Sequence, residues 1–155
     1  CAAAFGEANA DTWASEIGVL SRKKPISIIT RRTIETGVSG GVSSLGTLAS
    51  FLGAAFIGFS FSCIYFLTYG YNIIIIFSPF IITLLGFIGA IIDSFLVATL
   101  QAQYYCEEEK IITEKSSHKG KANRLIKGYR FFNNDVVNFL STLLCSLPIF
   151  LLIGR

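Results

Sequence analysis

Four acidic residues lie inside, or at the ends of, segments that are otherwise apolar. Asp11 and Glu16 belong to "ANADTWASEIG", Asp93 to "GAIIDSFLVATL" and Asp135 to "NNDVVNFL". An ionisable side chain in a membrane helix is costly, so by default such a residue indicates a functional site. Carboxylates bind Mg²⁺, and the ion bridges phosphate oxygens. The four acids therefore predict a metal site for phosphate chemistry, with all four as ligands and with Asp11 and Asp93 as catalytic residues.

Each acid also has a purely structural interpretation. Asp93 could form only a helix-packing hydrogen bond, and Asp11 and Glu16 could simply reach water from a helix end. Glu7 shares a helix face with Asp11, four residues away. It either lines the same cavity or faces a neighbouring helix.

A glycine-rich stretch, "ETGVSGGVSSLG", precedes a long apolar segment. Backbone N–H groups at the start of a helix favour phosphate. We therefore predict that this stretch contacts phosphate, although glycines also serve turns and close packing. Arg and Lys side chains from the polar loops, with Arg124 as the candidate, would neutralise the remaining phosphate charge.

Two asparagines next to Asp135 share one helix face. Asn134 and Asn138 are four residues apart. An N-cap would explain Asn133 or Asn134. It does not explain Asn138, which lies one turn deeper in an apolar helix.

The composition indicates the elements that must position these residues. The chain is 52% hydrophobic and 15% charged, with a mean hydropathy of +0.61, whereas soluble domains carry about 25% charged residues. No Asp, Glu, Lys or Arg occurs between Glu35 and Asp93. These features predict a membrane protein.

Apolar runs long enough to cross a bilayer occur at 43–67, 73–100 and 134–153, and residues 1–20 resemble the end of an earlier span. We expect an all-α, polytopic transmembrane helical bundle that forms a single membrane domain over 1–155. Loops 21–42 and 101–133 connect the helices. Small residues at four-residue spacing predict close helix packing, namely Gly46, Ser50, Ala54, Gly86 and Ala90.

Basic residues are distributed unevenly over the predicted loops. Of the 13 Lys and Arg residues, all but Arg155 lie in 21–42 or 101–133. Two spans separate these loops, so both lie on one side, which the positive-inside rule makes cytosolic. The predicted acid site then lies at the cytosolic face.

The cysteines, the single histidine and one acidic run give little indication of a functional site. The four cysteines, Cys1, Cys63, Cys106 and Cys145, lack paired metal-ligand spacing, so we expect no metal or redox role for them. His118 and the run "CEEEK" are expected to be solvated. Because the chain starts at Cys1 and contains no Met, we interpret it as a C-terminal fragment.

Four motifs also occur, in this order, in a known family. The motifs "ANADTWASEIG", "GVSGGVSSLGTLASFLGA", "GAIIDSFLVATLQ" and "NNDVVNFLST" resemble the integral-membrane family that includes transmembrane protein 19 and plant phytyl-phosphate kinase. The resemblance implies nucleotide-dependent phosphorylation of an isoprenyl monophosphate. It also implies that the site contains Asp11, Glu16 and Asp93, with cofactor-binding residues Gly37, Gly40, Gly41, Asn134 and Asn138. It also implies that several helices precede this fragment. Asn133, often Asp in the family, and Val97, often Gly, depart from the pattern.

We therefore expect a multi-pass phosphotransferase that acts on an isoprenyl (phytyl-like) phosphate with a nucleoside triphosphate and Mg²⁺. Its partners would be membrane lipid and these substrates, with no nucleic acid. The organelle stays open between, for example, the endoplasmic reticulum and the plastid envelope. A transporter or channel and a non-catalytic membrane scaffold are the alternatives. Convergence of the acids at one membrane face favours an enzyme over a transporter, whose acids should lie near the midplane.

Overall fold

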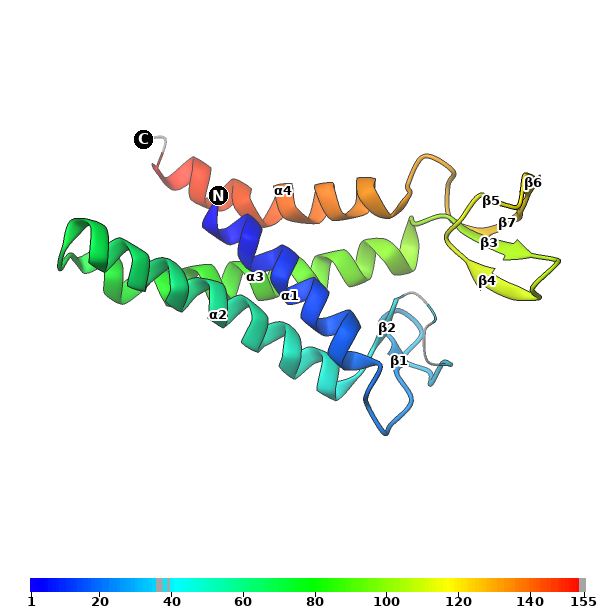
Figure 1. Ribbon diagram of the computed structural model, residues 1–155, viewed down its shortest axis with the longest axis horizontal. Helices are drawn as coiled ribbons and strands as arrows, with labels where there is room; N and C mark the ends of the chain where they lie inside the picture. Colours follow the sequence, from blue (N-terminus) through cyan, green and yellow to red (C-terminus); the bar gives the residue numbers. More distant parts are fainter. Residues whose placement is uncertain (36–37, 39, 154–155) are drawn as a thin grey trace.

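The computed structural model describes residues 1–35, 38 and 40–153. It contains four long helices: α1 (Ala2–Gly18), α2 (Ser44–Tyr69), α3 (Ile73–Thr99) and α4 (Asn134–Ile153). They lie where the sequence predicts helices, to within a few residues. Figure 1 shows α2 and α3 as an antiparallel pair, with α1 and α4 packed alongside. The chain is therefore mostly helical.

Two of these helices, α2 and α3, are long and apolar enough to cross a membrane, with mean hydropathies of 1.8 and 2.5. Only 22% and 33% of their most apolar windows are buried. A core helix of a soluble protein would bury most of this surface. Large side chains such as Phe59, Phe80 and Leu84 instead point outward, as lipid-facing side chains do.

Side-chain caps determine where the long helices begin. Ser43 Oγ accepts a hydrogen bond from Gly46 N at 3.0 Å, and Asn72 Oδ1 accepts one from Ile74 N at 3.2 Å. Asn133 Oδ1 accepts one from Val136 N at 2.9 Å. Each cap satisfies an N–H group that the first turn leaves unpaired. The cap of α4 is thus Asn133, one of the two residues that the sequence allowed.

Small residues let the helices approach closely, as the sequence predicts. A Cβ added at Gly86 would lie 2.7 Å from the backbone of Gly6, and one at Gly53 would lie 3.0 Å from Asn9 O. Gly53 O also accepts a hydrogen bond from Asn9 Nδ2 at 2.8 Å. Backbone contact of this kind holds α1 against α2 and α3.

The all-α expectation needs correction in both loops. Loop 21–42 contains the strand pair β1 (Ile26–Ser27) and β2 (Gly41–Val42). Loop 101–133 contains a three-stranded antiparallel sheet in the order β4-β3-β7, formed by Ile111–Thr113, Gln103–Cys106 and Arg124–Lys127. It also contains a hairpin of β5 (Ser117–His118) and β6 (Lys121–Ala122).

Local turn chemistry explains the β5–β6 hairpin. Lys119 and Gly120 form its two-residue turn with φ values of 46° and 82°. Two successive positive φ angles are typical of the turn that best matches the twist of a hairpin. Strands of two residues are too short to show an alternating pattern, so this segment reads as a polar loop in the sequence.

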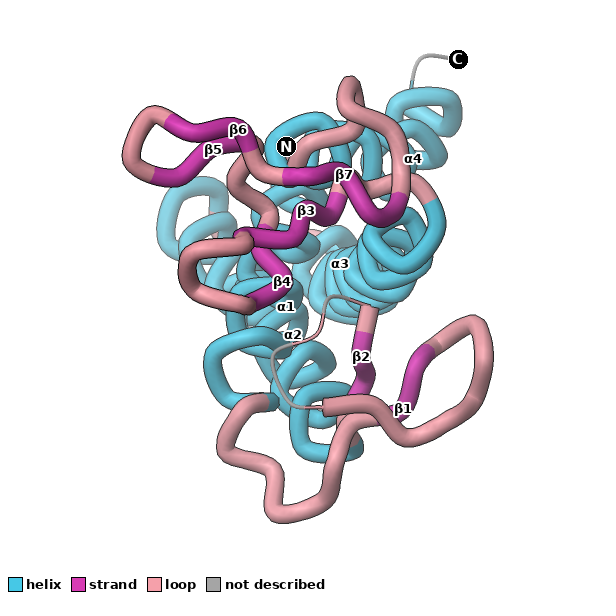
Figure 2. Tube along the Cα trace, turned by 90° about the vertical axis from the view of Figure 1, so that its right-hand side faces the viewer, coloured by secondary structure: helices cyan, strands magenta, loops and turns pink. Residues whose placement is uncertain are grey.

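Both strand-containing loops lie at one end of the bundle. Figure 1 shows β1–β2 and β3–β7 at the right-hand end and the turn between α2 and α3 at the opposite end. Figure 2, which views the molecule from that side, shows the strands in front of the helices. The basic loops therefore share one end, as their charge predicts.

Candidate functional site

A cavity of about 520 Å³ opens at the end of the bundle that carries the loops. Its walls come from α1, α2, α3 and the segment around β2, together with Asn134 at the start of α4. Of the residues predicted for a site, it is lined by Asp11, Asp93, Gly40, Gly41 and Asn134. Gly37 lies outside the described residues. Three of the four sequence motifs that suggested phosphate chemistry thus contribute side chains to one space, and the glycine-rich motif contributes its turn.

Asp11 and Asp93 form the centre of the acidic part. Asp93 is 4% exposed, Asp11 is half-buried, and their carboxyl groups lie within hydrogen-bonding reach of each other. None of the ion pairs found among the described residues includes either acid. Two carboxylates in contact repel each other unless a proton or a cation lies between them.

A second layer of polar groups lies below this pair, between α1, α3 and α4. Ser141 Oγ lies 2.8 Å from Glu7 Oε1, 3.1 Å from Asp93 Oδ1 and 3.0 Å from Asn138 O. A hydroxyl has one proton to donate, so it cannot satisfy all three acceptors. Thr142 Oγ1 donates to the other oxygen of Glu7 at 2.5 Å. The cluster needs a further proton or cation to be fully satisfied.

Asn138 contributes to the same cluster, one turn into α4. With its amide oriented to donate, Nδ2 reaches Asp93 Oδ1 at 3.3 Å and Asn134 O at 3.2 Å. This contact accounts for an asparagine that no N-cap explained. Asn138 thus binds an acid of the site, whereas Asn134 itself lines the cavity.

The glycine turn closes one side of the cavity against α3. Gly40 has φ +81°, and a Cβ there would lie 2.6 Å from the side chain of Ala98. Only glycine fits this conformation and this approach. The first turn of α2 follows, and its residues Ser43, Gly46 and Thr47 also line the cavity. A helix N-terminus is favourable for an anion.

The donor set fits Mg²⁺, which prefers oxygen ligands and is usually bound by one or two carboxylates together with substrate phosphate. Asp11 and Asp93 supply the carboxylates, and Lys23, which also lines the cavity, supplies a positive charge. The sequence analysis expected cations from the loops but proposed Arg124, which lies on β7 away from this cavity.

The structure does not bring two of the predicted acids to the site. Glu16 and Asp135 are exposed, and neither lines the cavity. Glu16 follows Asp11 by five residues, which turns it to another face of α1. Asp135 lies two residues after Asn133, the cap residue of α4, and is exposed. The expected convergence of four acids is therefore limited to Asp11 and Asp93, with Glu7 below them.

The sequence analysis missed Gln101 as a candidate site residue. It is 1% exposed and lines the cavity, and neither polar atom of its side chain has a hydrogen-bond partner among the described residues. Buried polar groups without a partner are rare. Gln101 directly follows the apolar run of α3, and this position was its only signal in the sequence.

The role of Glu7, left open by the sequence, is also defined by its contacts with Ser141 and Thr142.

Comparisons with known proteins agree with the family resemblance in the motifs. The family model described as "Integral membrane protein DUF92" matches residues 1–146. Protein PGR of Arabidopsis thaliana is 34% identical over 146 residues, which cover 89% of this chain and 48% of that protein. An uncharacterized membrane protein of Methanocaldococcus jannaschii is 47% identical over 51 residues, 33% of this chain and 21% of that protein. These matches span about half or less of each relative's length, and no solved structure matches.

Proposed function

This chain belongs to the DUF92 family of integral membrane proteins, and we propose that it is a multi-pass phosphotransferase. In this proposal it phosphorylates an isoprenyl phosphate with a nucleoside triphosphate and Mg²⁺. Loops 21–42 and 101–133 would face the cytosol. The observation that carries the proposal is the contact between Asp11 and Asp93 inside a cavity at the end of the bundle where the basic loops lie.

Phosphoryl transfer suits this arrangement because it requires positioning and charge stabilisation more than covalent chemistry from the protein. Asp11 and Asp93 would hold Mg²⁺, which when bound supplies positive charge to the phosphate oxygens. Ser141 and Asn138 contact Asp93 from α4. They would orient its carboxylate, so that its position does not depend on the ion alone.

The chain's other cavity residues would bind the two substrates. Lys23, the first turn of α2 and the turn at Gly40 and Gly41 would bind phosphate. Phe87, Ile91 and Val97 form an apolar wall from α3, which suits an isoprenyl chain. A volume of about 520 Å³ lies within the usual range for small-molecule sites.

One observation favours a second candidate, an ion-coupled transporter. Glu7 is 2% exposed and lies deeper in the bundle than Asp11, bonded to Ser141 and Thr142. Intramembrane acids with polar partners form proton and ion pathways in transporters. A scaffold, the third interpretation, does not explain why Asp11 and Asp93 converge in a cavity.

The test is the substitution Asp93→Asn. Asn keeps the size of the side chain and removes the charge that a metal ligand needs. We expect isoprenyl-phosphate phosphorylation to fall by at least ~100-fold, the scale for losing a preorganised electrostatic contact, with an unchanged melting temperature. The assay uses purified protein, labelled nucleoside triphosphate and an isoprenyl monophosphate.

Asp135→Asn is the matched control. It removes the same charge from an exposed position outside the cavity, so we expect its turnover to equal that of the wild type. Full activity in Asp93→Asn would reject the proposed enzyme. A wild type that transfers no phosphate but moves an ion across vesicles, in a manner that requires Glu7, would favour the transporter.

A further inference from the structure

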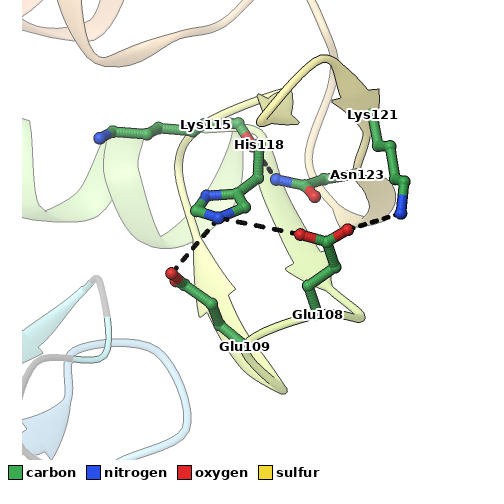
Figure 3. Close-up of polar contacts among 6 residues, drawn as sticks. All are labelled: Glu108, Glu109, Lys115, His118, Lys121 and Asn123. Carbon is green, nitrogen blue, oxygen red and sulfur yellow. Dashed lines mark hydrogen bonds and ion pairs between the residues drawn. The ribbon is translucent and has the colours of Figure 1, made fainter.

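Three side chains of different chemistry meet at the tip of the second loop. The ligand atoms of Cys106, Glu109 and His118 all lie within 4.8 Å of one another. Figure 3 shows the imidazole of His118 facing the carboxylates of Glu109 and Glu108. This group lies in loop 101–133 and shares no residue with the lining of the Asp11–Asp93 cavity.

The small sheets position the three residues. Cys106 ends β3, His118 ends β5, and Glu109 lies in the turn between β3 and β4. Cys106 is 2% exposed, so its thiol faces inward, whereas Glu109 is exposed at the rim. The tight turn at Lys119 and Gly120 pairs His118 with Lys121 in the β5–β6 hairpin. Backbone geometry therefore brings the three side chains together without a direct hydrogen bond among them.

The separations suit ligands of a shared ion better than a hydrogen-bonded network. His118 Nε2 lies 3.4 Å from Glu109 Oε1. This nitrogen is buried and has no hydrogen-bond partner among the described residues. Two ligands at 2.0–2.2 Å from a tetrahedral zinc ion lie about 3.4 Å apart. The imidazole nitrogen and the carboxylate oxygen, which form an ion pair when His118 is protonated, therefore have the spacing of two ligands of one ion.

The ligand types determine which class of ion fits. Thiolate and imidazole favour borderline ions such as Zn²⁺ over Mg²⁺ or Ca²⁺, which prefer oxygen. Glu108 Oε2 lies 4.0 Å from His118 Nε2, while its other oxygen pairs with Lys121 at 2.6 Å. A fourth position is thus available to water or to Glu108.

We propose that Cys106, Glu109 and His118 bind one zinc-like divalent ion that fastens the β5–β6 hairpin to β3. On binding, the thiol of Cys106 loses its proton to solvent, because the thiolate is the ligand. The ion closes the loop between positions 106 and 118 and so stabilises a segment whose strands are too short to be stable alone. This site is independent of the proposed phosphotransfer.

The test titrates Co²⁺ and then Zn²⁺ into purified, metal-stripped protein in detergent. Cobalt bound by a thiolate gives a sulfur-to-metal charge-transfer band, and displacement by Zn²⁺ removes it. We expect this band in the wild type, and we expect it to saturate at one equivalent of thiolate-bound Co²⁺ per chain. Cys106→Ser should abolish the band, and His118→Gln should weaken zinc affinity by at least ~10-fold, the lower limit seen even for supporting residues of metal sites.

Two control variants remove the same kinds of side chain, a carboxylate and a thiol, at positions outside the proposed metal-binding group. Glu107→Gln removes a neighbouring carboxylate that is not among the three, and Cys63→Ser removes an exposed thiol on α2. Both should bind metal like the wild type. A wild type without the charge-transfer band would overturn the proposal, whether or not the variants fold. Equal zinc affinity in Cys106→Ser, His118→Gln and wild type would also overturn it, because it would show adventitious binding only.

Discussion

The polar cluster in the bundle and the polar cluster in the second loop are assembled in opposite ways. Ser141 bonds to Glu7 across 134 positions of the chain and to Asp93 across 48. The loop cluster takes its three residues from the short stretch between Cys106 and His118. The first therefore depends on the packing of three helices. The second depends on local turns and, in our proposal, on an ion.

The two clusters also differ chemically. The bundle cluster consists of carboxylate and hydroxyl oxygen atoms and the amide of Asn138, and Asp93, Glu7 and Ser141 in it are buried between helices. The loop cluster offers sulfur, nitrogen and oxygen near the surface. A single chain would thus have one site suited to Mg²⁺ and phosphate and another suited to a softer ion. The difference shows how location affects a polar group. A group buried between helices needs hydrogen-bond partners within the fold, whereas a group near the surface can remain without a protein partner until a ligand binds.

Truncating one acid in each cluster tests this difference. Glu7→Ala removes the carboxylate that Ser141 and Thr142 both contact; Ser141 keeps Asp93 as an acceptor, whereas Thr142 loses its contact with Glu7 in a partly buried setting. We expect the free energy of unfolding to fall by about 1–3 kcal/mol, the range for a buried polar group left unsatisfied. In metal-stripped protein, Glu109→Ala should change it by no more than about 0.5 kcal/mol, as exposed positions usually do.

Thermal and denaturant unfolding in detergent would measure both variants. Glu7→Gln serves as the conservative control, because its amide can still accept one of the two hydroxyl hydrogen bonds, so its loss should be smaller. If Glu7→Ala and Glu109→Ala destabilise the protein equally, the proposed contrast between the clusters does not hold.

A smaller effect, on nucleoside triphosphate binding, is expected at two neighbouring lysines, of which one lines the cavity. Lys23 lines the cavity, whereas Lys24 pairs with Glu35 at 2.6 Å outside it. Lys23→Gln should weaken nucleoside triphosphate binding by about fivefold, which corresponds to about 1 kcal/mol for an exposed charge interaction. Lys24→Gln should leave it unchanged. Isothermal titration would distinguish them, and equal affinities in the two variants would remove Lys23 from the site.

Much of the bundle could be predicted from the sequence because its signals are physically costly. Long uncharged runs identify helices in a membrane protein, and an acid such as Asp93 within such a run has few structural explanations. The small-residue stripes likewise predict close packing, which Gly86 and Gly53 show. The rotation of each helix about its own axis could not be predicted from the sequence. This rotation leaves Glu16 and Asp135 outside the cavity.

The cluster of Cys106, Glu109 and His118 in the second loop was harder to predict, because residues of these types are common in polar segments without any shared role. Cys106 and His118 lack the paired spacing of known metal motifs, and a lone histidine in a polar loop is commonly solvated. Their proximity depends on two positive φ angles at Lys119 and Gly120. Gln101 is similar, since its burial depends on how the segment between β7 and α4 folds back over the end of α3.

The central claim, that Asp11 and Asp93 hold one divalent ion, is tested most directly by Mn²⁺ binding measured with electron paramagnetic resonance. We expect Asp11→Asn and Asp93→Asn each to raise the Kd for Mn²⁺ by at least ~10-fold. The loss in the double variant should be smaller than the product of the two single losses, because residues that share one site do not act additively. Asp135→Asn should bind Mn²⁺ like the wild type. Unchanged Mn²⁺ affinity in Asp11→Asn or Asp93→Asn would contradict the account.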